Sequence, residues 1–306
     1  MIQLVDVSAR AAPYSVSNLS LEAGAGVRSV LGKPSDGAPL LLAVLAGWVR
    51  PRSGKALVLG AFPEVGRRQI AYVPLDTRLP RSLRVAEVLE IAASLRGDNA
   101  GTARARLDVL GVASLADRWT DSLSPAEAHA VALAEAVTST ARVMLFDEPL
   151  VELEPRAHGG LGSILRARAE AGASIVIGTS SPRDALDLSD EQWVLDRGRI
   201  VATTRATDAR MLSASPRSRL RVLARDARAL LGALASEPHF GEIEMDGKAL
   251  LLGGTDAVAM AESVSRAALA AGVELEVMRL EAPTLDEVRA AGTQRRPAAR
   301  MPASSA

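Results

Sequence analysis

The first 60 residues alternate strand patterns with a single apolar helix. Apolar and polar positions alternate over residues 1–7, a short strand pattern follows at 19–21, and residues 27–31 form an apolar strand pattern. A turn that contains glycine comes next, and apolar residues then fill a predicted helix over 40–49. A strand, a loop and a helix in this order form a unit that can hold phosphate at the N-terminus of the helix.

The middle of the chain predicts a parallel sheet that is interrupted by a helical segment. Strand patterns lie at residues 55–59, 69–73, 142–146 and 174–178. A helix is predicted around 157–171, and strands that alternate with helices indicate a parallel α/β sheet. Residues 83–137 carry apolar positions at helical spacing, with breaks near 97–101 and 122–125, so we expect a helical insert there.

A different pattern begins after a short predicted hairpin over residues 192–202. The order from there is strand, helix, two strands joined by an Asp-Gly turn, helix and strand, which is the βαββαβ order of a small ferredoxin-like unit. We therefore expect residues 1–205 to form an α/β domain and residues 207–290 to form a second, α+β domain. Residues 291–306 are rich in Pro, Ala, Ser and Arg and offer little to bury, so we predict a disordered tail.

Length, charge and cysteine content narrow the class of protein. A chain of 306 residues with 48% hydrophobic and 24% charged residues is expected to fold as about two globular domains. Lys plus Arg equals Asp plus Glu at 36 each, so no net positive field attracts phosphate backbones, and we expect no nucleic-acid partner. The absence of cysteine excludes disulfides and fits a cytoplasmic protein.

Neither a secretion signal nor a membrane span is predicted. The first residues lack a basic region followed by an apolar core, which a signal peptide requires. The longest apolar run, residues 39–49, is much shorter than the ~20 residues that span a bilayer. Any link to a membrane is therefore expected to run through a partner.

The loop after the strand at residues 27–31 carries the first chemical motif. Gly32 and Gly37 have the spacing of the glycines in G-x-x-x-x-G-K-[ST], the loop whose backbone N–H groups and Lys cradle phosphates and whose hydroxyl holds magnesium. Ala38 stands where that loop has Lys, and Pro39 stands where it has Ser or Thr. Losing one charge-assisted contact costs about 1.5–3 kcal/mol, or roughly ten- to a hundredfold in affinity, so we expect ATP binding to be weak or absent.

Other residues of this loop offer an internal replacement for phosphate. Ser35 and Asp36 can accept the free N–H groups of the loop, and Pro39 suits the first position of a helix. We therefore expect the loop to cap itself. For Lys33 two interpretations remain: it reaches a phosphate from the wrong side of the loop, or it is a solvated surface lysine, which we favour.

Two further motifs follow in the order LSPAE and RVMLFDEP. In the first, Ser124 with Glu127 three residues later predicts a capping box at the start of a helix. In the second, Asp147 and Glu148 end an apolar strand. Two acids in such a place can orient a metal or polarise water, although they are a weak signal alone.

The order and spacing of these motifs resemble the ATP-binding cassette (ABC) subunits of membrane transporters over residues 1–205. The resemblance implies a P-loop NTPase-like α/β core with a helical subdomain, ATP and Mg as cofactors, Asp147 as a magnesium ligand and Glu148 as general base. LSPAE stands at the family's LSGGQ, which would give Ser124 a nucleotide contact, but we favour the capping box. Tyr14 is either the aromatic residue on which the family stacks adenine or a surface or core tyrosine.

Two other family positions carry unsuitable side chains. Leu75 occupies the position of a Gln that touches magnesium and the attacking water, and Ser180 occupies the position of a His that contacts the γ-phosphate. The resemblance therefore implies a cassette that has lost most of the side chains of its ATP chemistry.

Three hypotheses about function follow. We favour a catalytically degenerate ATP-binding subunit that pairs with an active second cassette, a transmembrane permease subunit or both, on the inner face of the cell membrane. The first alternative is a slow but genuine ATPase in which Asp147 and Glu148 act in a composite site and energise an exporter. The second alternative is a soluble, nucleotide-independent scaffold.

Overall fold

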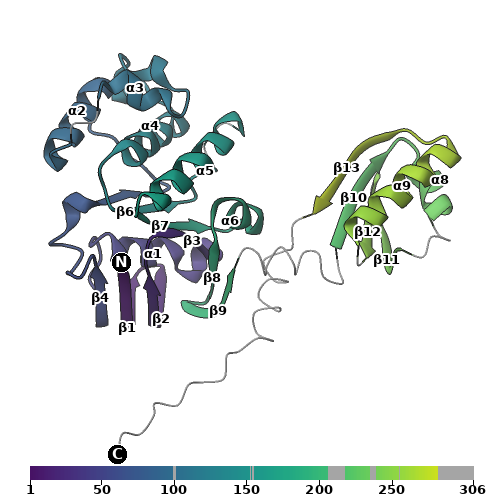
Figure 1. The fold of residues 1–306 in the computed structure, drawn as a ribbon, viewed down its shortest axis with the longest axis horizontal. Coiled ribbons are helices and arrows are strands. Elements are labelled where there is room, and N and C mark those ends of the chain that lie inside the picture. The colour runs from purple at the N-terminus through teal and green to yellow at the C-terminus, as the bar shows by residue number, and fades with distance from the viewer. Residues whose placement is uncertain are drawn as a thin grey trace, which may run out of the picture. The chain divides into compact units, whose positions relative to one another are not determined.

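The computed structural model describes residues 1–98, 101–151, 153, 155–205, 218–234, 239–254 and 256–281. The chain divides into two compact units, Met1–Thr204 and Arg205–Ala291 (Figure 1). The predicted tail, residues 291–306, lies outside the described residues. Among the helices of the described part, none is long and apolar enough to cross a membrane.

The first unit begins with a three-stranded antiparallel sheet in the order β2-β1-β4. Its strands are β1 (Ile2–Ala11), β2 (Tyr14–Ala23) and β4 (Ser53–Val58). The hairpin strands β1 and β2 have 10 residues each, which is longer than the patterns at 1–7 and 19–21 predicted. The pattern understated them because β-bulges shift the register between Leu4 and Val7 and interrupt the alternation.

A six-stranded sheet forms the centre of this unit, in the order β5-β6-β7-β3-β8-β9. Its strands are β3 (Gly26–Leu31), β5 (Ile70–Val73), β6 (Val143–Asp147), β7 (Ser174–Thr179), β8 (Glu191–Asp196) and β9 (Arg199–Arg205). The pairs from β5 to β8 are parallel, as the continuous apolar runs predicted. Parallel strands place the ends of β3 and β6, and therefore the loop and the two acids, at one edge of the sheet.

Helix α1 (Ala38–Leu45) lies between the two sheets. Its buried leucines join a core cluster that includes Ile2 and Leu4 of β1 and Val143 and Leu145 of β6. The helix was predicted over 40–49 but ends at Leu45, because the backbone at Gly47 has φ +72° and leaves the helical conformation. A fully apolar helix of this kind is held by packing on all sides.

The opposite face of the central sheet carries the helical insert. The helices on this side are α2 (Val85–Arg96), α3 (Ala103–Asp108), α4 (Pro125–Thr138), α5 (Pro155–Glu170) and α6 (Pro182–Leu188). The motif analysis did not predict α6, which begins at a local cap in which the Ser181 hydroxyl accepts the Asp184 N–H. Short 3-10 turns lie at Pro34–Asp36, Arg67–Gln69, Ala113–Leu115 and Thr120–Ser122.

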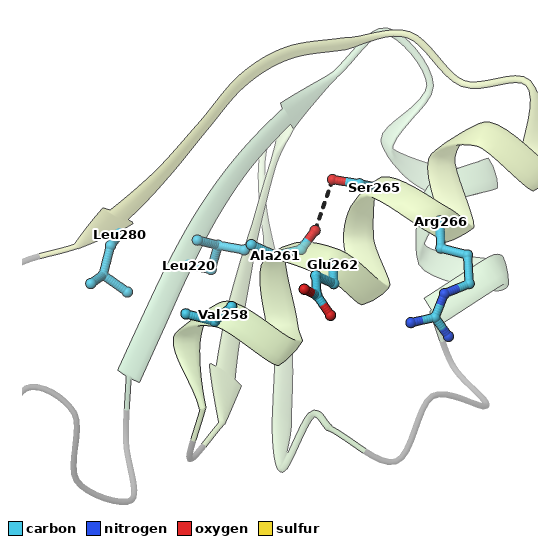
Figure 2. A pocket seen from close by; sticks show the side chains of 7 residues that line it. All are labelled: Leu220, Val258, Ala261, Glu262, Ser265, Arg266 and Leu280. Carbon is cyan, nitrogen blue, oxygen red and sulfur yellow. Dashed lines mark hydrogen bonds between the residues drawn. The ribbon is translucent and has the colours of Figure 1, made fainter.

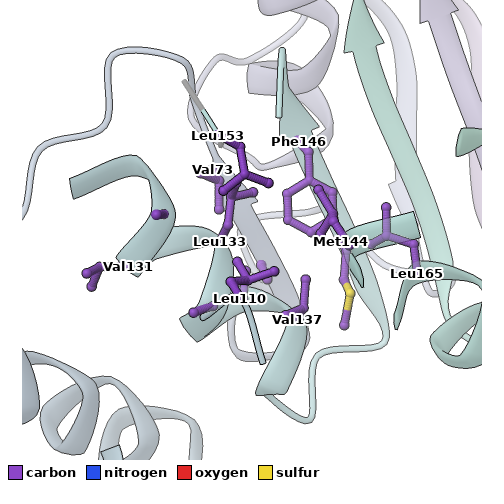
Figure 3. Packing of buried hydrophobic residues seen from close by; sticks show 14 of the residues in the cluster. Val73, Leu110, Val131, Leu133, Val137, Met144, Phe146, Leu153 and Leu165 are labelled. Carbon is purple, nitrogen blue, oxygen red and sulfur yellow. The ribbon is translucent and has the colours of Figure 1, made fainter. Parts of the chain in front are cut away.

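Strand β6 is buried on both faces and fixes the position of the acids that end it. Met144 and Phe146 point into the cluster that also contains Leu133 and Val137 of α4 (Figure 3). Val143 and Leu145 belong to the cluster around α1 on the other face. All five residues of the strand are buried, so its C-terminal end has little freedom to move.

The second unit is a ferredoxin-like βαββαβ fold. Its elements are β10 (Ser218–Ala224), α8 (Ala227–Leu234), β11 (Glu242–Asp246), β12 (Ala249–Gly254), α9 (Ala257–Ala271) and β13 (Leu275–Glu281). The strands pair antiparallel in the order β11-β12-β10-β13. Helices α8 and α9 cover one face, where Val222 and Leu250 are fully buried against them.

Candidate nucleotide site

The loop between β3 and α1 is fixed by close backbone contacts at both of its motif glycines. A Cβ atom on Gly32 would lie 2.8 Å from the Leu195 carbonyl oxygen. Gly37 has φ +103°, and a Cβ there would lie 2.9 Å from the Ser15 carbonyl oxygen. Both glycines are therefore required by packing against β8 and β2, whether or not a phosphate binds.

Asp36 closes this loop from within. Its side chain is buried, one carboxylate oxygen accepts the Lys33 N–H at 2.9 Å, and the other accepts the Arg197 N–H at 3.1 Å. The Asp36 carbonyl also accepts the Gly198 N–H at 2.9 Å, so the loop is tied to the turn between β8 and β9. The predicted self-capping is confirmed for Asp36, while the side chains of Ser35 and Lys33 are exposed.

The residues of the loop fit the phosphates of ATP poorly. Two of residues 33–39 are prolines and have no N–H to donate. The N–H groups of Lys33, Asp36 and Gly37 are donated to the Asp36 carboxylate and to carbonyl oxygens of the loop itself. A phosphate-binding loop depends on free backbone N–H groups and a lysine, whereas three of the N–H groups of this loop already have partners without a phosphate.

Helix α1 begins at Ala38, so Pro39 is its second residue and not, as predicted, its first; the missing N–H of Pro39 is tolerated there because the N–H groups of the first turn have no partner within the helix. Ala38 is buried and presents only a methyl group where a phosphate-binding loop has a lysine. A Cβ atom on Gly178 would lie 3.7 Å from the Ala38 Cβ and 3.1 Å from a carboxylate oxygen of Asp147. The loop and the acids are thus brought together on either side of Gly178, with no cation supplied at position 38.

Asp147 ends β6 as a buried carboxyl group, 7% exposed. Burial raises its pKa to about 6, the neighbouring charge of Glu148 adds to this, and a hydrogen bond from the Leu75 N–H opposes it. Leu75 contributes its backbone N–H to the site through this hydrogen bond, while its side chain is 39% exposed. Burial together with the Asp147 charge also raises the pKa of Tyr72.

Glu148 is held by the end of β7. It is 6% exposed, and its two carboxylate oxygens accept the Thr179 hydroxyl at 3.0 Å and the Ser180 N–H at 2.7 Å. Its φ of +48° lies in the left-handed region, which costs roughly 1–3 kcal/mol for a residue with a side chain and is retained only where surrounding contacts enforce it. The carboxylate is therefore positioned toward Thr179 and Ser180, and both of its oxygens already have donors.

The described residues do not gather three or more His, Asp or Glu side chains that could hold a metal ion. Asp147 and Glu148 supply two carboxylates. A magnesium ion at this place would depend on the phosphates and on the hydroxyl that the motif puts at position 39, where this chain has proline.

Ser124 starts α4 with the predicted capping box. Its hydroxyl accepts the Glu127 N–H at 3.2 Å, and the Glu127 carboxylate accepts the Ser124 N–H at 2.8 Å. The Ser124 N–H and the Arg118 guanidinium lower the pKa of Glu127. The helix end is thus satisfied by its own residues, and the structure does not group Ser124 with the loop and the acids.

Tyr14 is the first residue of β2, and it is half-buried against the cluster that contains α1. The carbonyl oxygen of the next residue, Ser15, occupies the space that a Cβ atom on either Gly37 or Gly198 would need. Tyr14 therefore lies one residue from the part of β2 that the loop contacts. Its packed environment is that of a core tyrosine, which was part of the second of the two interpretations.

Sequence reasoning did not identify Thr179 as a contact of the Glu148 carboxylate, or the Arg197 N–H as a contact of the Asp36 carboxylate. Thr179 had a usable signal, since it follows the buried strand directly and ends beside β6 in a parallel sheet. Arg197 had none, because it is 161 residues from Asp36 and approaches it only when β8 pairs with β3.

A parallel sheet with a loop before α1, an acid-ended strand and a helical insert define a P-loop NTPase-like core. Among solved structures, the chain resembles an ATP-binding subunit of an ABC transporter with a TM-score of 0.63 and 21% identity, over 69% of this chain and 92% of that one. It also resembles the ATP-binding cassette MJ0796 bound to ADP and Pi, with a TM-score of 0.59 and 17% identity, over 67% and 99% of the two chains. The fold of this core is that of the ABC ATPase cassettes.

Residues 15–151 match the family model of ABC transporters. The daunorubicin resistance ATP-binding protein DrrA3 of Streptomyces coeruleorubidus is 28% identical over 90% of this chain and 89% of that protein. The Fe(3+) ions import ATP-binding protein FbpC of Pseudomonas fluorescens is 33% identical over 61% of this chain, which spans 56% of that protein's length. The chain is thus similar to ATP-binding proteins of ABC transporters, and the family model matches 137 of its 306 residues.

Proposed function

We propose that the chain is a catalytically degenerate ATP-binding subunit of an ABC transporter. It pairs with a transmembrane permease, an active second cassette or both, and the permease holds it at the inner face of the membrane. The observation that carries the proposal is the buried Asp36 carboxylate, which accepts the N–H groups of Lys33 and Arg197 inside the loop that would otherwise hold phosphate. Known relatives are named as ATP-binding proteins of resistance and import systems, which supports a transport complex as the setting.

Two effects oppose nucleotide binding at this loop. Opening it for phosphate requires breaking the bonds of Asp36, and a phosphate would then meet a buried carboxylate of like charge. The missing lysine at position 38 removes a further charge-assisted contact of about 1.5–3 kcal/mol. In this proposal the chain retains the sheet and the surfaces of a cassette, while its loop is stabilised without a bound phosphate.

Rebuilding the loop tests this proposal. Equilibrium binding of Mg·ATP is measured for the native chain, Asp36→Ala, Ala38→Lys and the double variant, with Ser35→Ala as the exposed neighbouring control. We expect the double variant to gain roughly ten- to a hundredfold in affinity over the native chain, and the control to gain nothing. Equal affinity in all five proteins would show that neither residue limits binding.

The retention of Asp147 and Glu148 favours a second candidate, slow hydrolysis in a composite site. Both carboxylates are buried at the end of β6, where the family resemblance places a metal ligand and a general base. Phosphate release is compared between the native chain and Glu148→Gln, each alone and with a partner cassette. Release that requires Glu148 supports the second candidate, whereas release that is equal in both proteins at the background rate supports the degenerate subunit.

Assembly provides an independent test. Since both the loop and the LSPAE helix end are satisfied internally, ATP is not expected to drive two copies of this chain together. Sedimentation with and without Mg·ATP measures this, and an ATP-dependent dimer contradicts the proposal. Recovery of the full chain only in the soluble fraction, with no permease bound, would instead support the scaffold interpretation.

A further inference from the structure

We draw no further inference here: the strongest candidate, the shallow apolar groove that Leu220, Val258, Ala261 and Leu280 line between the sheet and α9 of the second unit (Figure 2), carries no proposal because nothing among the described residues shows what covers it.

Discussion

The stability of the first unit should depend on the carboxylate of Asp36. Asp36→Ala removes the acceptor of the Lys33 and Arg197 N–H groups and weakens the link between the loop and the turn between β8 and β9, where the backbone bond from the Gly198 N–H to the carbonyl at position 36 remains. A hydrogen bond to a charged group contributes about 1.5–3 kcal/mol, and water can replace part of each bond because the side chains on both donor residues are exposed. We expect a total loss of about 2 kcal/mol in the free energy of unfolding.

Tryptophan fluorescence reports this unit selectively. The three tryptophans, Trp48, Trp119 and Trp193, all lie within Met1–Thr204. In urea, a loss of about 2 kcal/mol lowers the midpoint by about 1 M if the slope is near 2 kcal/mol/M. Asp36→Asn keeps one acceptor and should lose about half as much, since only one of the two N–H groups then lacks a partner.

Ser35→Ala is the matched control, because Ser35 is the exposed neighbour in the same turn. It should change the free energy of unfolding by no more than about 0.5 kcal/mol. If Asp36→Ala proves as stable as Ser35→Ala, with the slope unchanged, the carboxylate does not hold the loop and the explanation of its self-capping is wrong.

Three further substitutions probe other parts of the first unit by the same urea assay. Burial and the Glu148 charge raise the pKa of Asp147 from 3.8 to about 6, so stability is lost as the pH rises from about 4 to 6. Asp147→Asn should therefore gain up to about 3 kcal/mol at pH 8, and the gain should disappear below pH 4. Ser124→Ala removes a helix cap and should lose about 1 kcal/mol, while Ser124→Thr keeps most of it; equal losses would argue against the cap. Glu135→Ala leaves the buried Arg106 without its carboxylate partner. It should lower the free energy of unfolding by about 3 kcal/mol even in high salt, whereas a loss that salt abolishes would indicate a surface pair instead.

The elements that form the candidate site could be predicted because their patterns are local. Strands such as β6 are buried on both faces and appear as continuous apolar runs, and the two acids follow directly. The self-capping by Asp36 also followed from the sequence, since an acid inside a loop before a helix has few other donors to bind. The capping box of Ser124 and Glu127 is local in the same way.

The contacts that decide the chemistry of the site are not local. Asp36 meets the Arg197 N–H across 161 residues, and Glu148 meets Thr179 across 31. Leu75 showed no polar side chain, so its backbone bond to Asp147 had no sequence signal. Such contacts follow from the strand order of the central sheet, which single-sequence patterns do not specify.

A direct titration of the native full chain with Mg·ATP tests the central claim, that the loop is closed by Asp36 and no longer holds nucleotide. Intrinsic tryptophan emission and calorimetry provide two independent signals. The claim predicts no saturable binding up to about 1 mM, the range of the weakest specific ligands. A saturable transition with a Kd in the micromolar range would contradict it.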